Sequence, residues 1–196
     1  MKNLTLPILD NLDRQLLNEW NNTQADYPLT ACFPQLFEQQ VARTPNAVAV
    51  IFKQQQLTYH QLNTRANRWA RHLVGLGVGL EKIVGLMGDR NIDFLTAILA
   101  IFKAGGAYLP LNPAHPAARN QQVLAQSQVT LVLASQNCHE IIAPMVAQLE
   151  SQPQLLDLED LDRVEYDSDN LVARCCPDNL AYVIYTSGST GPRQGP

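Results

Sequence analysis

Short apolar runs alternate with helical patterns along this chain, and this alternation restricts the folds that it can adopt. The runs at residues 82–87, 107–110, 129–134 and 180–185 have the length and composition of buried strands. The segments between them repeat apolar residues every three or four positions, as helices that face a core do. Strands that alternate with helices form parallel sheets through right-handed crossovers. The sequence therefore predicts an α/β fold with a mostly parallel sheet and helices on both faces.

Local capping signals mark where several of these helices begin and end. Thr58 and Gln61 have the spacing of a capping box, with Thr58 at the N-cap and Gln61 reaching back to it. Asn91 is suited to cap the helix expected over residues 92–102. Residues 75–79 contain three alternate glycines, but they follow a helix and precede a strand. A dinucleotide-binding fingerprint opens a helix, so we interpret these glycines as C-cap and turn residues.

The first 30 residues differ in character from the rest of the chain. Apolar residues recur at helical spacing within residues 4–20, and residues 21–28 form a polar segment. We interpret residues 1–30 as an N-terminal connector and residues 31–196 as part of one domain. The acidic stretch at residues 157–169 is expected to be a solvent-exposed linker.

Composition and charge argue against several classes of partner. The chain is 46% apolar and 16% charged, with a net charge of −4, so it offers no basic surface for nucleic acid. It has no apolar run long enough for a membrane span and no signal-peptide core. Its four cysteines form no C-x-x-C pair, and Cys175 and Cys176 are adjacent, which favours neither a zinc site nor a disulfide framework. We expect a cytoplasmic protein with no nucleic-acid or membrane partner and no metal ligand assigned.

Directly after the apolar run at residues 180–185, the sequence changes to hydroxyl residues and glycines. Glycines let the backbone turn tightly and approach a ligand, and clustered N–H and hydroxyl groups suit a polyphosphate. The alternative is a solvated Ser/Gly turn. The segment is not a Walker A loop, because no Gly-Lys-Ser/Thr follows. The candidate phosphate-binding residues are Thr186, Ser187, Gly188, Ser189, Thr190 and Gly191.

This segment resembles the phosphate loop of the adenylate-forming (AMP-binding) enzymes, Y-T-S-G-[ST]-T-G-x-P-K-G. Residues 185–191 match at every position, and Gly195 stands where the last glycine is expected. Arg193 replaces the proline of the pattern, and Gln194 replaces its lysine.

Two further motifs follow the same family in order and spacing. Residues 57–62 are similar to L-[TS]-Y-x-E-L, with Gln61 in place of Glu. Residues 102–113 are similar to L-K-A-G-x-A-Y-[VL]-P-[IL]-D-P, with Asn112 in place of Asp. The amino-acid adenylation domains of nonribosomal peptide synthetases fit best. The resemblance therefore implies a partial N-terminal subdomain of the adenylate-forming fold.

The resemblance implies a reaction in two steps. An amino-acid carboxylate attacks the α-phosphorus of ATP to give aminoacyl-AMP and pyrophosphate, and the phosphopantetheine thiol of a carrier protein then accepts the acyl group. ATP and Mg²⁺ are the implied cofactors, and an upstream condensation domain is an implied neighbour in the full-length context. The phosphate loop is expected to hold the β- and γ-phosphates. Gln194 supplies no charge there, which costs about 1.5–3 kcal/mol if a charge-assisted hydrogen bond is lost.

Several of the family's functional motifs lie beyond the phosphate loop and are not in this sequence. They include the adenine and ribose motifs, the magnesium carboxylate, the amino-acid pocket and the catalytic lysine. We therefore expect a truncated fragment of an adenylation domain that is inactive alone. Two alternatives remain: a nucleotide-binding module without turnover, and a non-catalytic interaction fragment with exposed apolar surface. Amino-acid specificity and oligomeric state stay open.

Overall fold

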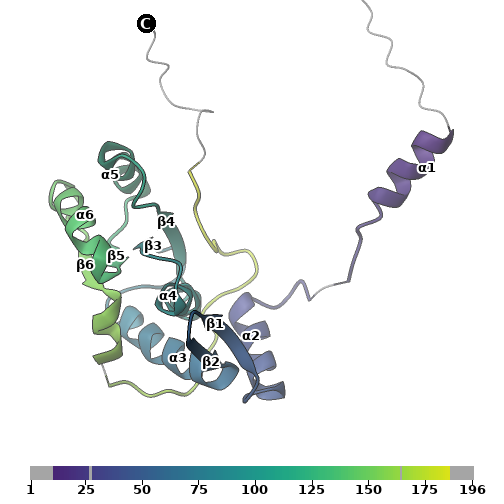
Figure 1. Cartoon of the computed structure of the whole chain (residues 1–196), viewed down its shortest axis with the longest axis horizontal. Helices are drawn as coiled ribbons and strands as arrows, with labels where there is room; N and C mark the ends of the chain where they lie inside the picture. Colours follow the sequence, from purple (N-terminus) through teal and green to yellow (C-terminus); the bar gives the residue numbers. More distant parts are fainter. Residues whose placement is uncertain (1–10, 27, 164, 186–196) are drawn as a thin grey trace, which may run out of the picture.

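The computed structural model describes residues 11–26, 28–163 and 165–185, and its centre is a four-stranded parallel sheet (Figure 1). The central strands pair in register, with Val84 opposite both Tyr108 and Leu131. The predicted α/β fold with a mostly parallel sheet is confirmed. In spatial order the strands are β4 (Ala107–Leu111), β3 (Ile83–Met87), β5 (Leu131–Ala134) and β6 (Gln154–Asp157).

Helices cover both faces of this sheet, as predicted. Side chains alternate along β3, so Val84 and Leu86 pack with Trp69 on one face. Met87 packs with Leu124 and other residues of the opposite face. This two-sided burial explains why the strand is a continuous apolar run. The first face carries α3 (Tyr59–Gly75) and α4 (Ile92–Lys103), and the second carries α5 (Ala117–Ser127) and α6 (Gln136–Ala147).

An antiparallel hairpin and a helix cover the outer side of α3. The hairpin consists of β1 (Val48–Phe52) and β2 (Gln55–Thr58), and the helix is α2 (Phe33–Arg43). Their apolar side chains pack against Leu62 and Ala66 of α3.

The predicted caps are confirmed by hydrogen bonds. Gln61 N donates to Thr58 Oγ1 at 3.2 Å, and Thr58 N donates to the Gln61 side-chain oxygen at 2.9 Å, which is the capping box. Asn91 Oδ1 accepts from Phe94 N at 2.9 Å at the start of α4. Gly77 has φ of 89°, a left-handed conformation suited to glycine after the end of α3.

The N-terminal segment contributes one helix that stands apart from the sheet. This helix, α1 (Asn11–Trp20), extends to one side of the molecule in Figure 1. Leu17 and Trp20 are exposed on it. A helix was expected over residues 4–20, and the part of it before Asn11 lies outside the described residues. Among the described residues, no helix combines the length and apolar content that crossing a membrane requires.

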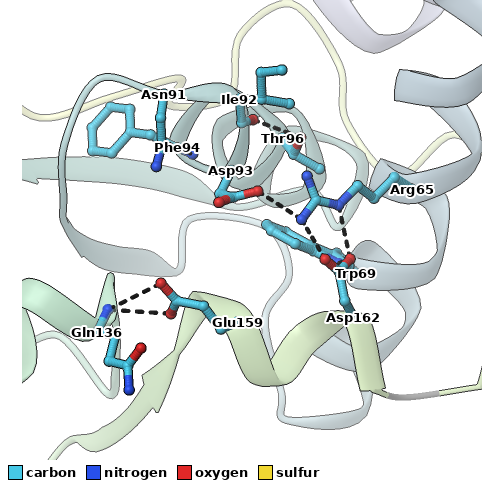
Figure 2. Close-up of polar contacts among 10 residues, drawn as sticks. All are labelled: Arg65, Trp69, Asn91, Ile92, Asp93, Phe94, Thr96, Gln136, Glu159 and Asp162. Carbon is cyan, nitrogen blue, oxygen red and sulfur yellow. Dashed lines mark hydrogen bonds and ion pairs between the residues drawn. The ribbon is translucent and has the colours of Figure 1, made fainter. Parts of the chain in front are cut away.

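The acidic stretch is not a solvated linker over its first half, and this expectation was wrong. Residues Leu158–Arg163 form a 3₁₀ helix, η1, in which Leu158 and Leu161 are buried. Figure 2 shows Glu159 accepting two hydrogen bonds from Gln136 N, both at 3.2 Å, at the start of α6. A carboxylate there complements the helix dipole. Two leucines at i, i+3 spacing anchor the stretch, and its acids serve as acceptors instead of facing only water.

Asp162 links the same stretch to α3 through side-chain hydrogen bonds (Figure 2). Its carboxylate accepts hydrogen bonds from Arg65 and from Trp69 Nε1, the latter at 2.8 Å. Arg65 also pairs with Asp93 of α4, at 2.6 Å, and its guanidinium lies 4.6 Å from the Trp69 ring centroid. Burial lowers the pKa of Arg65, but the two carboxylates outweigh it and raise that pKa overall. This cluster joins α3, α4 and η1.

Candidate functional site

The carboxyl ends of the central strands meet at one edge of the sheet. Met87, the last residue of β3, pairs with Leu111 at the end of β4 and with Ala134 at the end of β5. The loops that follow these strands therefore begin at the same level. In open α/β sheets, ligands bind in the crevice outside the carboxyl ends of the strands. This edge is the place where the fold favours a binding site.

The run at residues 180–185 extends this edge beyond β4. Val183 N donates to Tyr108 O at 3.0 Å, and Tyr108 N donates to Ala181 O at 3.2 Å. The resulting bridge between Tyr108 and Tyr182 is parallel, so the run points the same way as the strands. Tyr185 thus arrives at the carboxyl edge. The expectation that the candidate loop follows the carboxyl end of an extended segment agrees with this placement.

The same run is not a buried strand, and that expectation was wrong. Within the described residues it makes a single bridge, with Tyr182 54% exposed and Ile184 60% exposed. Val183 and Tyr185 alternate with them and pack against the cluster beneath α5 and α6. One face of the run is therefore covered and the other is open. Burial of a strand depends on its neighbours, and here the described part of the chain supplies a neighbour on one side only.

A cavity of about 320 Å³ opens at this edge, between the loop after β3, the loop after β4 and the first turns of α5. Two arginines and two asparagines line it, and no Asp or Glu does so among the described residues. Tyr185, the residue before the predicted loop, forms part of its wall. The polar lining is Gly88, Arg90, Asn112, His115, Arg119 and Asn120.

Hydrogen bonds within this lining shape the loop after β4. Asn112 Oδ1 accepts from Ala114 N at 2.9 Å, which tightens the turn. Asn120 is buried, and its Nδ2 donates to Asn112 O at 2.9 Å, which ties the loop to α5. At the last residue of α5, Ser127 Oγ lies 3.3 Å from Tyr185 Oη. The cavity wall is thus held by contacts that leave both arginine side chains available.

The predicted phosphate-binding residues lie outside the described part of the chain, which reaches the edge at Tyr185. Their role stays a prediction, and Arg193, Gln194 and Gly195 lie outside it as well. The predicted residues that the structure does not describe are Thr186, Ser187, Gly188, Ser189, Thr190 and Gly191. The sequence did not single out Arg90 or Arg119. The only signal in the sequence was their position: Arg90 lies between a predicted strand and the next helix, and Arg119 lies near the start of a helix.

Other notable groups of the described chain lie away from this edge. Lys103 is buried and paired with Glu38 of α2; burial lowers its pKa, and the carboxylate partly offsets the effect. Burial, with Cys32 and Cys176 nearby, raises the pKa of Cys175 to about 12. A larger hollow of about 590 Å³ lies between α5 and α6, but glutamines and small residues dominate its wall. The ion pair and the cysteine belong to the packing of the fold, and neither they nor the hollow brings reactive groups together.

The described residues do not form a site for Mg²⁺. Nowhere among them are three His, Cys, Asp or Glu side chains gathered closely enough to hold a metal ion. His139 Nδ1 lies 2.5 Å from Asp157 Oδ1, but this is a contact between the start of α6 and the end of β6. The carboxyl edge instead presents cationic and neutral donors, which suit an anionic ligand.

Comparison with known proteins agrees with this geometry. The chain is 41% identical over 189 residues to tyrocidine synthase 3 of Brevibacillus parabrevis, covering 96% of this chain and 3% of that protein. It is 43% identical over 169 residues to zwittermicin A synthase ZmaJ of Bacillus cereus, covering 85% of this chain and 31% of that protein. The chain thus spans well under half the length of these relatives.

Solved structures show the same fold. A nonribosomal peptide synthetase, FmoA3, bound to α-methyl-L-serine-AMP, superposes with a TM-score of 0.77 at 30% identity, over 91% of this chain and 20% of that one. An anthranilate CoA ligase, AuaEII, in complex with anthranoyl-AMP, has a TM-score of 0.75 at 20% identity, over 83% of this chain and 33% of that one; at this identity it shows the fold alone. Residues 37–195 match the family described as AMP-binding enzyme. The resemblance found in the sequence is confirmed: this chain belongs to the AMP-binding enzyme family, with peptide synthetases among its relatives.

Proposed function

We propose that this chain supplies the phosphate-binding part of an amino-acid adenylation domain in a nonribosomal peptide synthetase. In the complete domain, an amino-acid carboxylate attacks the α-phosphorus of ATP, the bond to the bridging oxygen breaks, and pyrophosphate leaves. The aminoacyl-AMP then passes its acyl group to the phosphopantetheine thiol of a carrier protein. The family match and the identities of 41% and 43% to two synthases support this proposal.

One structural observation carries the proposal. The extended segment that ends at Tyr185 runs parallel to β4 and brings the chain to the carboxyl edge of the sheet. Residues 186–191 continue from that point with four hydroxyls and two glycines. A loop of this composition offers backbone N–H groups and hydroxyls to the β- and γ-phosphates without a steric barrier. Its contribution is to position the triphosphate and to stabilise its charge.

The partners of such a domain follow as part of the proposal. ATP and an amino acid are its substrates, and a carrier protein receives the product. The connector, including α1, joins the domain to an upstream condensation domain. The reaction uses ATP of the cytoplasm, which is where we place the protein.

The test is a titration of the 196-residue chain with Mg-ATP, followed by amide NMR. We expect chemical-shift changes at residues 186–191 and at Tyr185. The variant Gln194→Lys restores the charge of the family pattern and should tighten binding by roughly ten- to a hundredfold, the equivalent of about 1.5–3 kcal/mol. Gln54→Lys, an exposed position in the hairpin turn, adds the same charge elsewhere and should change little.

Two results would count against the proposal. ATP binding that leaves residues 186–191 unshifted would separate the loop from the nucleotide. Amino-acid-dependent ATP–pyrophosphate exchange by this chain alone would show that it holds a complete active site and not the phosphate-binding part of one. We expect no exchange from the chain alone.

A further inference from the structure

The cavity at the carboxyl edge carries positive charge that its surroundings do not neutralise. Arg90 comes from the loop after β3, and Arg119 from the first turn of α5. Within the described part of the chain, neither guanidinium makes an ion pair or a side-chain hydrogen bond. The neighbouring acid, Asp89, faces Asn137, whose Nδ2 lies 3.5 Å from its carboxylate. Two arginines therefore line one cavity, and none of the described residues adds a carboxylate to that lining.

The α5 helix adds to this charge. Its N-cap is Pro116, which gives no side-chain acceptor to the first N–H groups of the helix. An uncapped helix N-terminus carries a partial positive charge and has free donors. Arg119 lies in this first turn, so its guanidinium and the helix end act on the same region. The start of α6 differs, because Glu159 already occupies it.

A buried hydroxyl lies against the same wall. Ser135 follows β5 and is only 5% exposed, yet its Oγ has no hydrogen-bond partner within the described residues. This oxygen is 3.4 Å from the point where a Cβ on Gly88 would lie, and Gly88 lines the cavity. This oxygen has less than 1 Å² of accessible surface and lies behind Gly88, so it does not itself line the cavity.

We propose that Arg90 and Arg119 form a polyphosphate subsite at the carboxyl edge, which takes the pyrophosphate end of a nucleoside triphosphate. This proposal rests on the function proposed above, because the cavity wall includes Tyr185, which leads into the phosphate loop. Guanidinium groups suit phosphate oxygens, since their planar forks donate two parallel hydrogen bonds. In the family pattern a lysine supplies positive charge where this chain has Gln194. In this proposal Arg90 and Arg119, from the loop after β3 and from α5, supply that charge instead.

The size and chemistry of the cavity favour this ligand over a larger or an apolar one. A volume of about 320 Å³ accommodates a small anion or the tail of a nucleotide. The side chains that can donate are those of Arg90, Arg119, exposed His115 and Asn112, whereas Asn120 Nδ2 already donates to Asn112 O. A singly charged anion would leave one guanidinium without a partner, while pyrophosphate can satisfy both.

The experiment measures binding of sodium pyrophosphate, without divalent cations, to the 196-residue chain by isothermal titration calorimetry. Arg90→Gln and Arg119→Gln should each weaken binding by about tenfold or more. Arg119→Lys, which keeps the charge but not the planar fork, should weaken binding less than Arg119→Gln does. Arg68→Gln is the matched control, because Arg68 is exposed on α3, on the opposite side of the sheet. Unchanged far-UV circular dichroism verifies that each variant is folded.

Each possible result either supports the subsite or contradicts it. Equal affinity in the unmodified chain and both Gln variants would overturn it, and so would an equal loss in Arg68→Gln or an absence of pyrophosphate binding. Parallel titrations with ATP and AMP separate it from the proposed function. Arginine-dependent pyrophosphate binding without shifts of residues 186–191 by ATP would support the subsite and refute the proposed loop. If ATP shifts residues 186–191 equally in the unmodified chain and in both arginine variants, the proposed loop is supported and the subsite is refuted. AMP, which lacks the pyrophosphate end, should show no binding that depends on either arginine.

Discussion

Removing the carboxylate of Asp162 should destabilise the chain because it leaves a buried donor without a partner. Trp69 is 1% exposed, and its Nε1 donates to Asp162 at 2.8 Å. A buried donor that loses its acceptor costs about 1–3 kcal/mol. The ion pair with Arg65 adds about 0–1 kcal/mol, because Asp162 is itself exposed and Arg65 keeps Asp93 as a partner. We therefore expect Asp162→Ala to lower the free energy of unfolding by about 1–4 kcal/mol.

A second variant separates the hydrogen bond from the charge. Asp162→Asn keeps an oxygen that accepts from the Trp69 indole but removes the negative charge, so its cost should stay below about 1 kcal/mol. Urea denaturation followed by far-UV circular dichroism measures both values. Equal destabilisation by the two variants would refute the reasoning, because it would assign the effect to charge. A negligible loss in Asp162→Ala would show that η1 does not hold α3 in solution.

Two further predictions concern a cysteine and a glycine. The pKa of Cys175 is raised to about 12, so at pH 8 only ~10⁻⁴ of it is thiolate, and alkylation followed by mass spectrometry should modify exposed Cys176 first. The folded chain keeps this proton longer than the unfolded chain, whose thiol titrates near 9.0; its stability should therefore fall as the pH rises from 9 towards 12, and Cys175→Ser should flatten that decline. Gly106→Ala places a Cβ 2.8 Å from Val78 Cγ1 and 3.1 Å from a backbone oxygen, which should cost about 1–3 kcal/mol in thermal or urea unfolding. Gly79→Ala meets nothing within 4 Å and should be neutral or slightly stabilising; equal losses in the two variants would contradict the steric explanation.

Local signals in the sequence were sufficient to predict most of the fold. The capping box at Thr58 and the N-cap at Asn91 depend on residues within one helical turn of each other. The parallel sheet followed from alternation of strands and helices alone. These features are decided by short-range chemistry, which a single sequence displays.

Non-local packing accounts for the errors. Asp162 finds its partner Arg65 at a separation of 97 residues, and nothing near Asp162 in the sequence indicates this partner. The open face of the run at residues 180–185 depends on which strand lies beside it, not on its own apolar residues. Arg90 and Arg119 line one cavity because the loops that follow β3 and β4 begin at the same edge of the sheet. A motif search does not find such a pair, since the strand register brings it together.

Three departures of this chain from the family pattern replace a charged residue with an amide, at Gln61, Asn112 and Gln194, and the structure describes the first two. Gln61 replaces Glu, yet its side-chain oxygen accepts from Thr58 N at 2.9 Å, as a carboxylate would. Asn112 replaces Asp, and its Oδ1 accepts from Ala114 N at 2.9 Å. Both positions need an acceptor, which an amide supplies, so the local structure persists.

Gln194 is different, because the lysine that it replaces has to supply positive charge to phosphates and not merely a hydrogen bond. An amide can donate to an oxygen but cannot offset the charge of a triphosphate. If the chain binds nucleotide, the missing charge has to come from another element that reaches the same edge. Within the described residues, the cavity beside Tyr185 brings two unneutralised guanidiniums to that edge. Restoring the lysine in a chain that carries Arg119→Gln should therefore recover more affinity for ATP than the same change recovers in the unmodified chain.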